Sequence, residues 1–324
     1  MTFREAGSDI DNLGRHSASL ERDDANIVIG LVNSMPPPAI AATTKQFTDW
    51  VTSSSHQGKI RFRYFSPSDF RRRDDHYEDI SALWKSRLDG LIVTGTEPQA
   101  ASMTDEPLWP TLRRLVDWAG ENTISTIWSC FAAHAAVFRL DGVKRQRFDD
   151  KLSGVFECTK VGDHSIISAA PAQWPVPHSR YNTLGEDLLN QTGYTLLSRG
   201  PRIGADTFFK HSRNSLFLFF QGHPEYDHGI LFREYCRDID RFLSGQCRSY
   251  PRMPEGYFTQ DIINRLTILK EKAQRAPSLA LLSAFDESLA TSIGQSWREP
   301  GRRVSAGWLS YIAAQKSTRT ELRA

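Results

Sequence analysis

Short continuous runs of apolar residues recur along the chain and are its strongest structural signal. The clearest are residues 27–32 (IVIGLV), 90–94 (GLIVT) and 216–221 (LFLFFQ). Runs of this length are typical of strands that are buried on both faces of a parallel sheet. Residues 60–65 alternate between apolar and polar side chains, and residues 125–128 (STIW) are β-branched and apolar, so both predict further strands.

Helical patterns follow most of these strands. The segments with a helical apolar face or an alanine-rich sequence are residues 43–51, 108–119, 132–140 and 230–243. Repeated strand–helix units predict an α/β fold with a parallel sheet, helices on both faces and right-handed crossovers. Ligands in such sheets bind at the carboxyl ends of the strands.

The distribution of polar, apolar, glycine and proline residues divides the chain into three parts. Residues 1–24 are polar and without periodicity, so we expect a flexible lead-in. Residues 25–250 are expected to form the main domain, in which glycines and prolines between about 150 and 210 indicate a β-rich insertion of short strands. Residues 251–324 are expected to form a helical extension packed on the same domain. Its expected helices lie at residues 261–274, 279–292 and 308–314.

The amino-acid composition limits which classes of binding partner are expected. The 324 residues contain 40 Lys plus Arg and 38 Asp plus Glu, a formal net charge of +2, which provides no general attraction for nucleic acid or for an acidic membrane. The amino terminus lacks the apolar core of a signal peptide, and no apolar run approaches the roughly 18 to 20 residues that cross a bilayer. We therefore expect a cytoplasmic protein whose partners are set by local sites.

The cysteines are expected to be free thiols. Cys130, Cys158, Cys236 and Cys247 form no CxxC pair, so their spacing favours neither a zinc site nor a thioredoxin motif, and disulfides are rare in a reducing compartment. We expect no metal site.

Cys130 stands where a predicted strand passes into a predicted helix, in the segment STIWSCFAAHAAVF. A strand-to-helix elbow of this kind presents a nucleophile, and the helix N-terminus lowers the pKa of a thiol placed there. Taken alone, Cys130 has the ordinary alternative of a small buried apolar residue.

A second group of reactive residues follows the strand at 216–221. In the segment QGHPEYD, His223 and Glu225 flank Pro224. His223 would take and return a proton, and Glu225 would orient the imidazole and stabilise its charged form. Each has an ordinary alternative, as a core histidine or a helix-start carboxylate. Their combination across a proline that fixes the turn favours a Cys–His–Glu triad. His134 is a weaker alternative base, because its helix turn directs it away from Cys130.

Several short motifs resemble those of the homoserine O-acyltransferases of the succinyltransferase, or transsuccinylase, type, which share the class I glutamine amidotransferase fold. The matching segments are SMPP at 34–37, DGLIVTG at 89–95, LWP at 108–110, KLSGVFE at 151–157, PHSRY at 177–181 and GHPEYD at 222–227. They occur in the family's order and, with weaker matches downstream, span most of residues 27–312. The resemblance implies a flavodoxin-like parallel sheet flanked by helices, and family members are often homodimers.

The resemblance also implies a two-step acyl transfer. Cys130 would accept an acyl group from an acyl-CoA co-substrate as a thioester, and His223 would then deprotonate the hydroxyl of L-homoserine for attack on that thioester. No cofactor is implied.

Four residues in matched motifs are expected to bind the substrates. Arg237 and Arg180 look similar to the family residues that hold the amino acid's carboxylate, a role that suits an arginine fork. Isolated arginines more often form surface salt bridges, but their place in matched motifs favours the binding role. Ser153 and Tyr226 lie in the KLSGVFE and GHPEYD motifs and complete this set.

The loop after the first strand departs from the family pattern. The family reads Met-Pro-Lys-Lys there, and its lysine region helps form the oxyanion hole, whereas here Met35 is followed by prolines at 36–38. Proline offers neither an ammonium group nor a backbone N–H. The backbone N–H groups of Phe131 and Ala39 are therefore the expected oxyanion donors, with Lys45 as a further candidate.

The loop after residue 95 does not identify which acyl group is transferred. Family members carry an Ala-Pro pair and then a residue that separates succinyl from acetyl donors; here Gln99 falls at that position, and Glu97 lies nearby. An insertion between Tyr257 and Trp297 is a further departure. We expect succinyl or acetyl transfer to L-homoserine. The alternatives are a thiol amidohydrolase of the glutaminase kind and a catalytically altered relative that acts on another hydroxy amino acid such as serine.

Overall fold

The computed structural model describes residues 27–54, 59–67, 76–285 and 294–321; the lead-in expected at residues 1–24 lies outside them. Six strands make up the parallel half of a sheet: β1 (Ile27–Val32), β2 (Ile60–Ser66), β3 (Tyr77–Asp79), β4 (Gly90–Val93), β5 (Ser125–Ser129) and β10 (Ser215–Phe220). Four strands add an antiparallel half: β6 (Gln146–Lys160), β7 (Gln173–Thr183), β8 (Thr195–Gly200) and β9 (Gly204–Ser212).

The two halves form one continuous sheet of ten strands in the order β3-β2-β1-β4-β5-β10-β9-β8-β6-β7. The region expected as a β-rich insertion therefore extends the main sheet through the pairing of β9 with β10. Its strands are not all short, since β6 has 15 residues. The predicted α/β architecture is confirmed, and the parallel half contains every strand that was predicted from a continuous apolar run.

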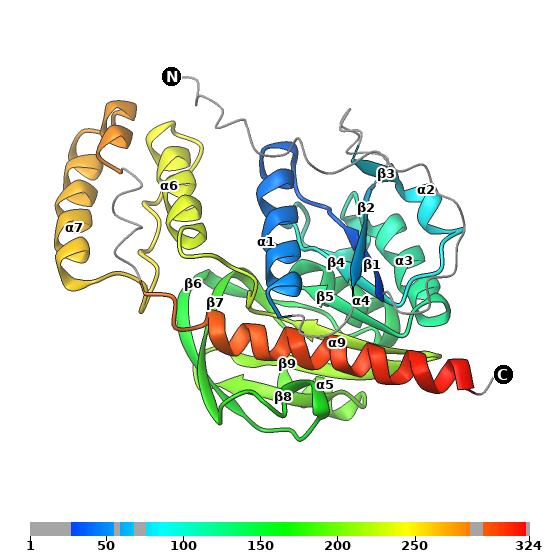
Figure 1. Cartoon of the computed structure of the whole chain (residues 1–324). Coiled ribbons are helices and arrows are strands. Elements are labelled where there is room, and N and C mark those ends of the chain that lie inside the picture. Colours follow the sequence, from blue (N-terminus) through cyan, green and yellow to red (C-terminus); the bar gives the residue numbers. More distant parts are fainter. Residues whose placement is uncertain (1–26, 55–58, 68–75, 286–293, 322–324) are drawn as a thin grey trace.

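Helices lie on both faces of this sheet (Figure 1). The α-helices are α1 (Ile40–Thr52), α2 (Ile80–Leu83), α3 (Trp109–Asn122), α4 (Phe131–Asp141), α5 (Glu186–Gln191), α6 (Ile230–Leu243), α7 (Gln260–Arg275) and α9 (Arg298–Glu321). The short 3-10 turns are η1 (Pro37–Ala39), η3 (Met103–Asp105), η4 (Ser165–Ile167) and η5 (Leu279–Ala284). The predicted helices at 43–51, 108–119, 132–140, 230–243 and 261–274 correspond to α1, α3, α4, α6 and α7.

The C-terminal helix differs from its prediction. Helix α9 has 24 residues, whereas a short helix at 308–314 was expected. Gly301 and Gly307 weaken the helical pattern in the first turns of α9, so the sequence did not predict where the helix begins. Close packing explains both glycines. A Cβ at Gly301 would lie 2.9 Å from the Pro224 carbonyl oxygen, and one at Gly307 would lie 2.0 Å from the Ile166 carbonyl oxygen. Of the helix expected at 279–292, residues 279–284 form η5, and residues 286–293 lie outside the described part.

Alternating side chains of the central strands fill two separate cores. In β10, Leu216, Leu218 and Phe220 join the cluster that contains Trp308 of α9. Phe217 and Phe219 point the other way, into the cluster formed with α3 and α4. A strand covered on both faces needs apolar residues at consecutive positions, which explains why β10 reads as an unbroken apolar run.

A third apolar cluster joins α6, α7 and η5 to Trp297. The described residues between Tyr257 and Trp297 therefore pack on α6, which leads away from the loop after β10. The Trp297 indole N–H donates to the backbone oxygen of Tyr226 at 2.9 Å, which ties this segment to that loop. No helix among the described residues combines the length and apolar character needed to span a bilayer.

Candidate active site

Cys130 occupies a strained turn between β5 and α4. Its backbone has φ 51° and ψ −110°, a conformation that non-glycine residues rarely adopt. The Cys130 N–H donates to the Phe220 carbonyl at 2.7 Å, and its carbonyl accepts from the His134 N–H at 3.3 Å, so both neighbouring elements hold the turn. This is the geometry of a nucleophile elbow, in which the side chain is lifted above the sheet.

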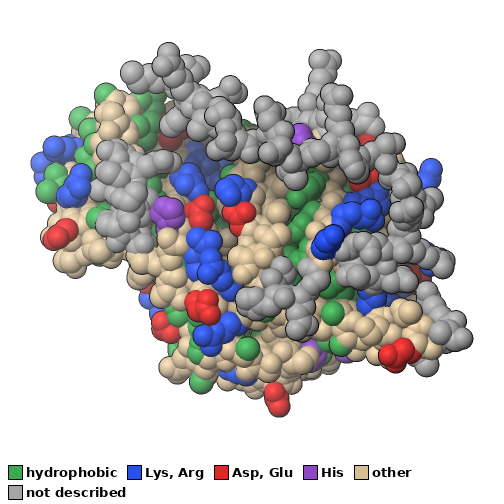
Figure 2. All heavy atoms as spheres, viewed as in Figure 1, with side chains coloured by type: hydrophobic (Ala, Val, Ile, Leu, Met, Phe, Trp, Pro, Cys, Tyr) green, Lys and Arg blue, Asp and Glu red, His purple; other side chains and the backbone are tan. Residues whose placement is uncertain are grey.

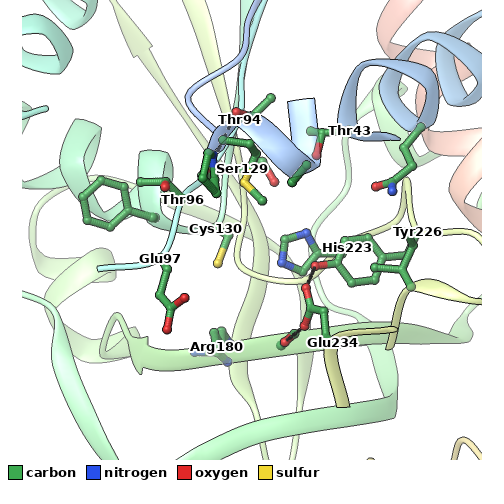
Figure 3. Close-up of a pocket in the computed structure, with 18 of the residues that line it drawn as sticks. Thr43, Thr94, Thr96, Glu97, Ser129, Cys130, Arg180, His223, Tyr226 and Glu234 are labelled. Atoms are coloured by element: carbon green, nitrogen blue, oxygen red, sulfur yellow. Dashed lines mark hydrogen bonds between the residues drawn. The ribbon is translucent and has the colours of Figure 1, made fainter. Parts of the chain in front are cut away.

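His223 and Glu225 follow β10 and form a buried pair. The His223 Nδ1 lies 2.7 Å from the Glu225 Oε1, and the two residues are only 8% and 7% exposed. Burial by itself would lower the pKa of His223, but the negative charges of Glu225 and Cys130 outweigh it and hold this pKa well above its ordinary value. The imidazolium form is therefore favoured, and Cys130 and His223 face the same cavity (Figure 3).

Tyr226 supports the histidine from the side. Its ring stacks on the His223 ring with the centroids 4.2 Å apart and the planes 16° apart. The Tyr226 hydroxyl donates to the Glu234 Oε1 at 2.9 Å, and a second Glu234 oxygen accepts from the Ser179 hydroxyl. The imidazole plane is thus set both by the Glu225 carboxylate and by an aromatic ring that is itself held in place.

The cavity has a volume of about 320 Å³ and lies at the carboxyl ends of β1, β4, β5 and β10. Nine of the predicted site residues line it: Cys130, His223, Glu225, Tyr226, Arg237, Arg180, Phe131, Ala39 and Glu97. Ser153 and Gln99 do not. Gln99 is exposed, and its backbone N–H donates to Glu106, while Ser153 of β6 pairs with Ser179 of β7.

The two arginines predicted to bind a carboxylate differ in how far their guanidinium groups are already engaged by protein acceptors. Arg180 is 2% exposed and donates to the backbone oxygens of Asn182 and Ile203 at 2.7 Å each. Burial lowers the pKa of Arg180 to about 10, while the charge of the nearby Cys130 acts in the opposite direction. Arg237 has a half-exposed side chain and a long ion pair of 3.3 Å with Asp238. Arg237 is therefore the freer group for a substrate carboxylate.

A buried charge cluster in the cavity wall was not assigned from the sequence. The Lys151 Nζ lies 2.7 Å from the Asp238 carboxylate and 3.5 Å from that of Glu234. Burial alone would raise the pKa of Glu234, but the positive charges of Lys151 and Arg237 hold it below its ordinary value. Lys151 opens the KLSGVFE motif, and Glu234 and Asp238 are one helical turn apart in α6. Only the fold shows that these three residues meet.

One backbone donor beside Cys130 is unengaged. The Phe131 N–H has no protein acceptor among the described residues, whereas the Ala39 N–H already donates to the Pro36 carbonyl at 2.9 Å within η1. A Cβ at Gly95 would lie 3.2 Å from both the Phe131 nitrogen and the Cys130 Cβ. Gly95 therefore allows its strand end to lie close to the backbone of the Cys130 turn.

Two other candidates from the sequence have partners elsewhere. Lys45 pairs with Asp49 at 2.7 Å on the surface of α1. His134 is buried, its Nε2 lies 3.1 Å from the Gln221 Oε1, and burial lowers its pKa to about 3. His134 is therefore neutral, and its side chain is fixed in the interior by its contact with Gln221.

One group of ligand-type atoms lies behind the site. Cys158, His178 and Asp206 are buried, and their ligand atoms lie within 4.8 Å of one another. The Asp206 carboxylate already accepts from Ser198 and Thr207, and burial raises the pKa of the Cys158 thiol. A protonated thiol is a poor metal ligand, so the chemistry of this buried group does not favour a metal site.

The chain is similar in sequence and in fold to known proteins. The model of the family described as homoserine O-succinyltransferase matches residues 10–319. A homoserine O-succinyltransferase of Rhodopseudomonas palustris is 42% identical over 96% of this chain and 95% of its own length, and one of Bradyrhizobium japonicum is 45% identical over 80% and 82%. A glutamine amidotransferase structure from Methylobacillus flagellatus is similar in fold, with 15% identity and a TM-score of 0.50 over 89% of this chain and 95% of that one. The chain belongs to the homoserine O-succinyltransferase family.

Proposed function

We propose that the protein transfers a succinyl group from succinyl-CoA to the hydroxyl of L-homoserine. The observation that carries this proposal is Cys130 at a strained elbow beside the buried His223–Glu225 pair. The names of the relatives support succinyl as the group and homoserine as the acceptor. The absence of disulfides among the four cysteines agrees with a cytoplasmic enzyme.

The first step forms an acyl-enzyme. The Cys130 thiolate attacks the thioester carbonyl, the Phe131 N–H stabilises the oxyanion, and the bond from carbonyl carbon to the CoA sulfur breaks. The His223 imidazolium donates its proton to the departing CoA thiolate. The products of this step are free CoA and a succinyl thioester on Cys130.

The second step regenerates the enzyme. Neutral His223 takes the proton of the homoserine hydroxyl as the oxygen attacks the Cys130 thioester, and the Cys130 thiolate leaves. Glu225 stabilises the imidazolium that forms again. Arg237 is the group that we assign to the homoserine carboxylate, because it lines the cavity and is only weakly paired. Glu97, at the rim, remains a candidate for selecting the acyl group.

The test offers the purified protein L-homoserine with either succinyl-CoA or acetyl-CoA. The release of free CoA thiol is followed, and the product is identified by mass spectrometry. We expect O-succinylhomoserine, a succinyl adduct on Cys130 when homoserine is omitted, and neither in Cys130→Ala. Full activity of Cys130→Ala would refute the proposal. Release of ammonia from glutamine without acyl transfer would favour a thiol amidohydrolase, and transfer only to serine would favour an altered acceptor.

A further inference from the structure

A second cavity of about 210 Å³ adjoins the catalytic one. The two cavities share four lining residues, which are Ala42, Gln46, Glu225 and Arg233. The second cavity is lined by residues of α1, the loop after β10, α6 and the first two turns of α9. Figure 2 shows Lys and Arg side chains, with acidic ones among them, gathered on this face of the molecule.

Most charges around the second cavity are neutralised in pairs. Lys45 pairs with Asp49 at 2.7 Å, and Arg233 pairs with Asp227 at 3.1 Å. The remaining acid, Glu225, is bound to His223 as described above. These pairs leave Arg298 and Arg302 of α9 as the excess positive charge on the cavity wall.

Arg302 is the decisive residue of this cavity. Its Nε atom is buried without a hydrogen-bond partner, and its guanidinium has neither an ion-pair partner nor a hydrogen-bond acceptor within the described ranges. Among the residues that the structure describes, the nearby Arg298 donates to a neutral group, the Gln295 Oε1, at 3.0 Å. A partly buried guanidinium without a protein acceptor is costly, so an anion in the cavity would stabilise Arg302.

We propose that the Arg298–Arg302 cavity binds the phosphate groups of the coenzyme A carrier. This inference rests on the proposed function, which places the donor's thioester at Cys130. Ala42 and Gln46 of α1 line both cavities, so the carrier's neutral arm can pass along α1 from the thiol to the arginines. A guanidinium fork can donate two parallel hydrogen bonds to two oxygens of one phosphate group.

The first experiment compares two donors in the Arg302→Gln variant. Succinyl-CoA carries the phosphates, whereas the succinyl thioester of N-acetylcysteamine presents the same reacting group without them. We expect the ratio of kcat/KM for succinyl-CoA to that for the truncated donor to fall by about 10- to 100-fold, the effect of losing one charged hydrogen bond. An unchanged ratio would overturn the inference.

Arg303→Gln is the matched control. Arg303 is the next residue of α9, but it is exposed, does not line the cavity and pairs with Glu299 at 3.1 Å. We expect this variant to keep the wild-type ratio. An equal fall in both variants would contradict a local phosphate site, and far-ultraviolet circular dichroism checks that both variants are folded.

The second experiment does not depend on turnover. Calorimetric titration measures the binding of CoA and of inorganic pyrophosphate to the wild type and to both variants. We expect CoA to bind the wild type and Arg303→Gln, and to bind Arg302→Gln at least tenfold more weakly. If pyrophosphate shows this dependence on Arg302 and CoA does not, the site serves a free anion and the carrier assignment is wrong. CoA binding of the expected kind without acyl transfer would defeat the proposed function and leave this inference standing.

Discussion

At the scale of single residues, the site depends on side chains whose neighbours force unusual states. Cys130 holds a backbone conformation that costs of order 1–3 kcal/mol, and hydrogen bonds from β10 and α4 maintain it. His223 is buried yet favours its charged form, because two negative groups flank it. Such perturbed groups concentrate at catalytic sites, and His223 lines the same cavity as Cys130.

The charge of Glu225 is expected to be essential for turnover. Glu225→Gln keeps the shape of the side chain but removes the carboxylate that raises the pKa of His223, so we expect kcat/KM to fall by about 10³- to 10⁴-fold. The rate of CoA release measures this loss. Glu255→Gln is the control, because Glu255 forms an exposed ion pair with Arg202 away from the cavity. An activity of Glu225→Gln within threefold of the wild type would exclude a role for the charge.

Gln221 is expected to be a critical stability residue beneath the site. It is fully buried, its Nε2 donates to the Ala205 carbonyl at 2.6 Å, and its Oε1 accepts from the Leu184 N–H at 2.9 Å. Gln221→Leu leaves these backbone groups unsatisfied, so we expect a loss of about 3 kcal/mol or more in the free energy of unfolding. Urea denaturation measures the loss. The exposed Gln191→Leu should change this free energy by less than about 0.5 kcal/mol, and equal effects would contradict the argument.

At the scale of elements, α9 closes one face of the sheet. Trp308 is fully buried, and its indole N–H donates to the Ser125 hydroxyl at 2.9 Å. Its ring packs on β4 at Gly90, where an added Cβ would lie 2.9 Å from it. The strand that delivers Cys130 is therefore covered by a helix that begins more than 150 residues later in the sequence.

Removing the Trp308 ring is expected to destabilise the whole sheet. Trp308→Ala should cost about 3–5 kcal/mol through lost burial and the cavity left behind, whereas Trp308→Phe keeps most of the ring and should cost less. Chemical denaturation with both variants gives this ranking. Ser310→Ala, on the exposed side of α9, is the control. A Trp308→Ala variant as stable as the control would show that α9 does not contribute to the core.

At the scale of the whole molecule, a buried polar network joins the two halves of the sheet beneath the cavity. His178 lies 3.3 Å from Asp206 and accepts from the Arg180 Nε at 3.2 Å. Arg180 and His134 both contact the Gln221 Oε1. The network thus connects α4 and β10 with the antiparallel strands β7 and β9, so the extension of the sheet also builds the floor of the site.

The network predicts a loss of stability in mild acid. Burial lowers the pKa of His134 to about 3 and that of His178 to about 4, whereas histidines in the unfolded chain titrate near 6.5. Between these values the unfolded state binds more protons, so stability falls as the pH drops below about 6.5. Each histidine should contribute a loss of about 2 kcal/mol between pH 6.5 and pH 5.

The pKa shift of His223 has the opposite effect on the pH dependence of stability. Its raised pKa adds stability that is complete below about pH 6.5 and is lost only as the pH rises through the folded-state pKa, so it does not mask the decline in acid. Urea denaturation at pH 7 and pH 5 measures the decline. In His134→Gln the difference between the two pH values should shrink. Equal differences in this variant and in the wild type would contradict the neutral, buried state of His134.

The sequence alone predicted the parallel strands β1, β2, β4, β5 and β10, but not β3, and it placed the candidate reactive residues after strand ends. Continuous apolar runs predicted β1, β4 and β10 because a strand buried on both faces needs apolar side chains at every position. The elbow at Cys130 and the pair His223 and Glu225 were predictable because each follows a strand directly. These properties are local, so they can be recognised within a few residues.

Only the tertiary structure decided how distant segments meet. It joined the four strands β6, β7, β8 and β9 to the parallel strands, and it placed Lys151 against Glu234 and Asp238. It also left the buried Arg302 Nε without a hydrogen-bond partner in the described part of the chain. It also engaged the Ala39 N–H within η1 and left Gln99 outside the cavity. Strand pairing, burial and charge neutralisation depend on groups far apart in the chain. No local pattern of residues can therefore specify them.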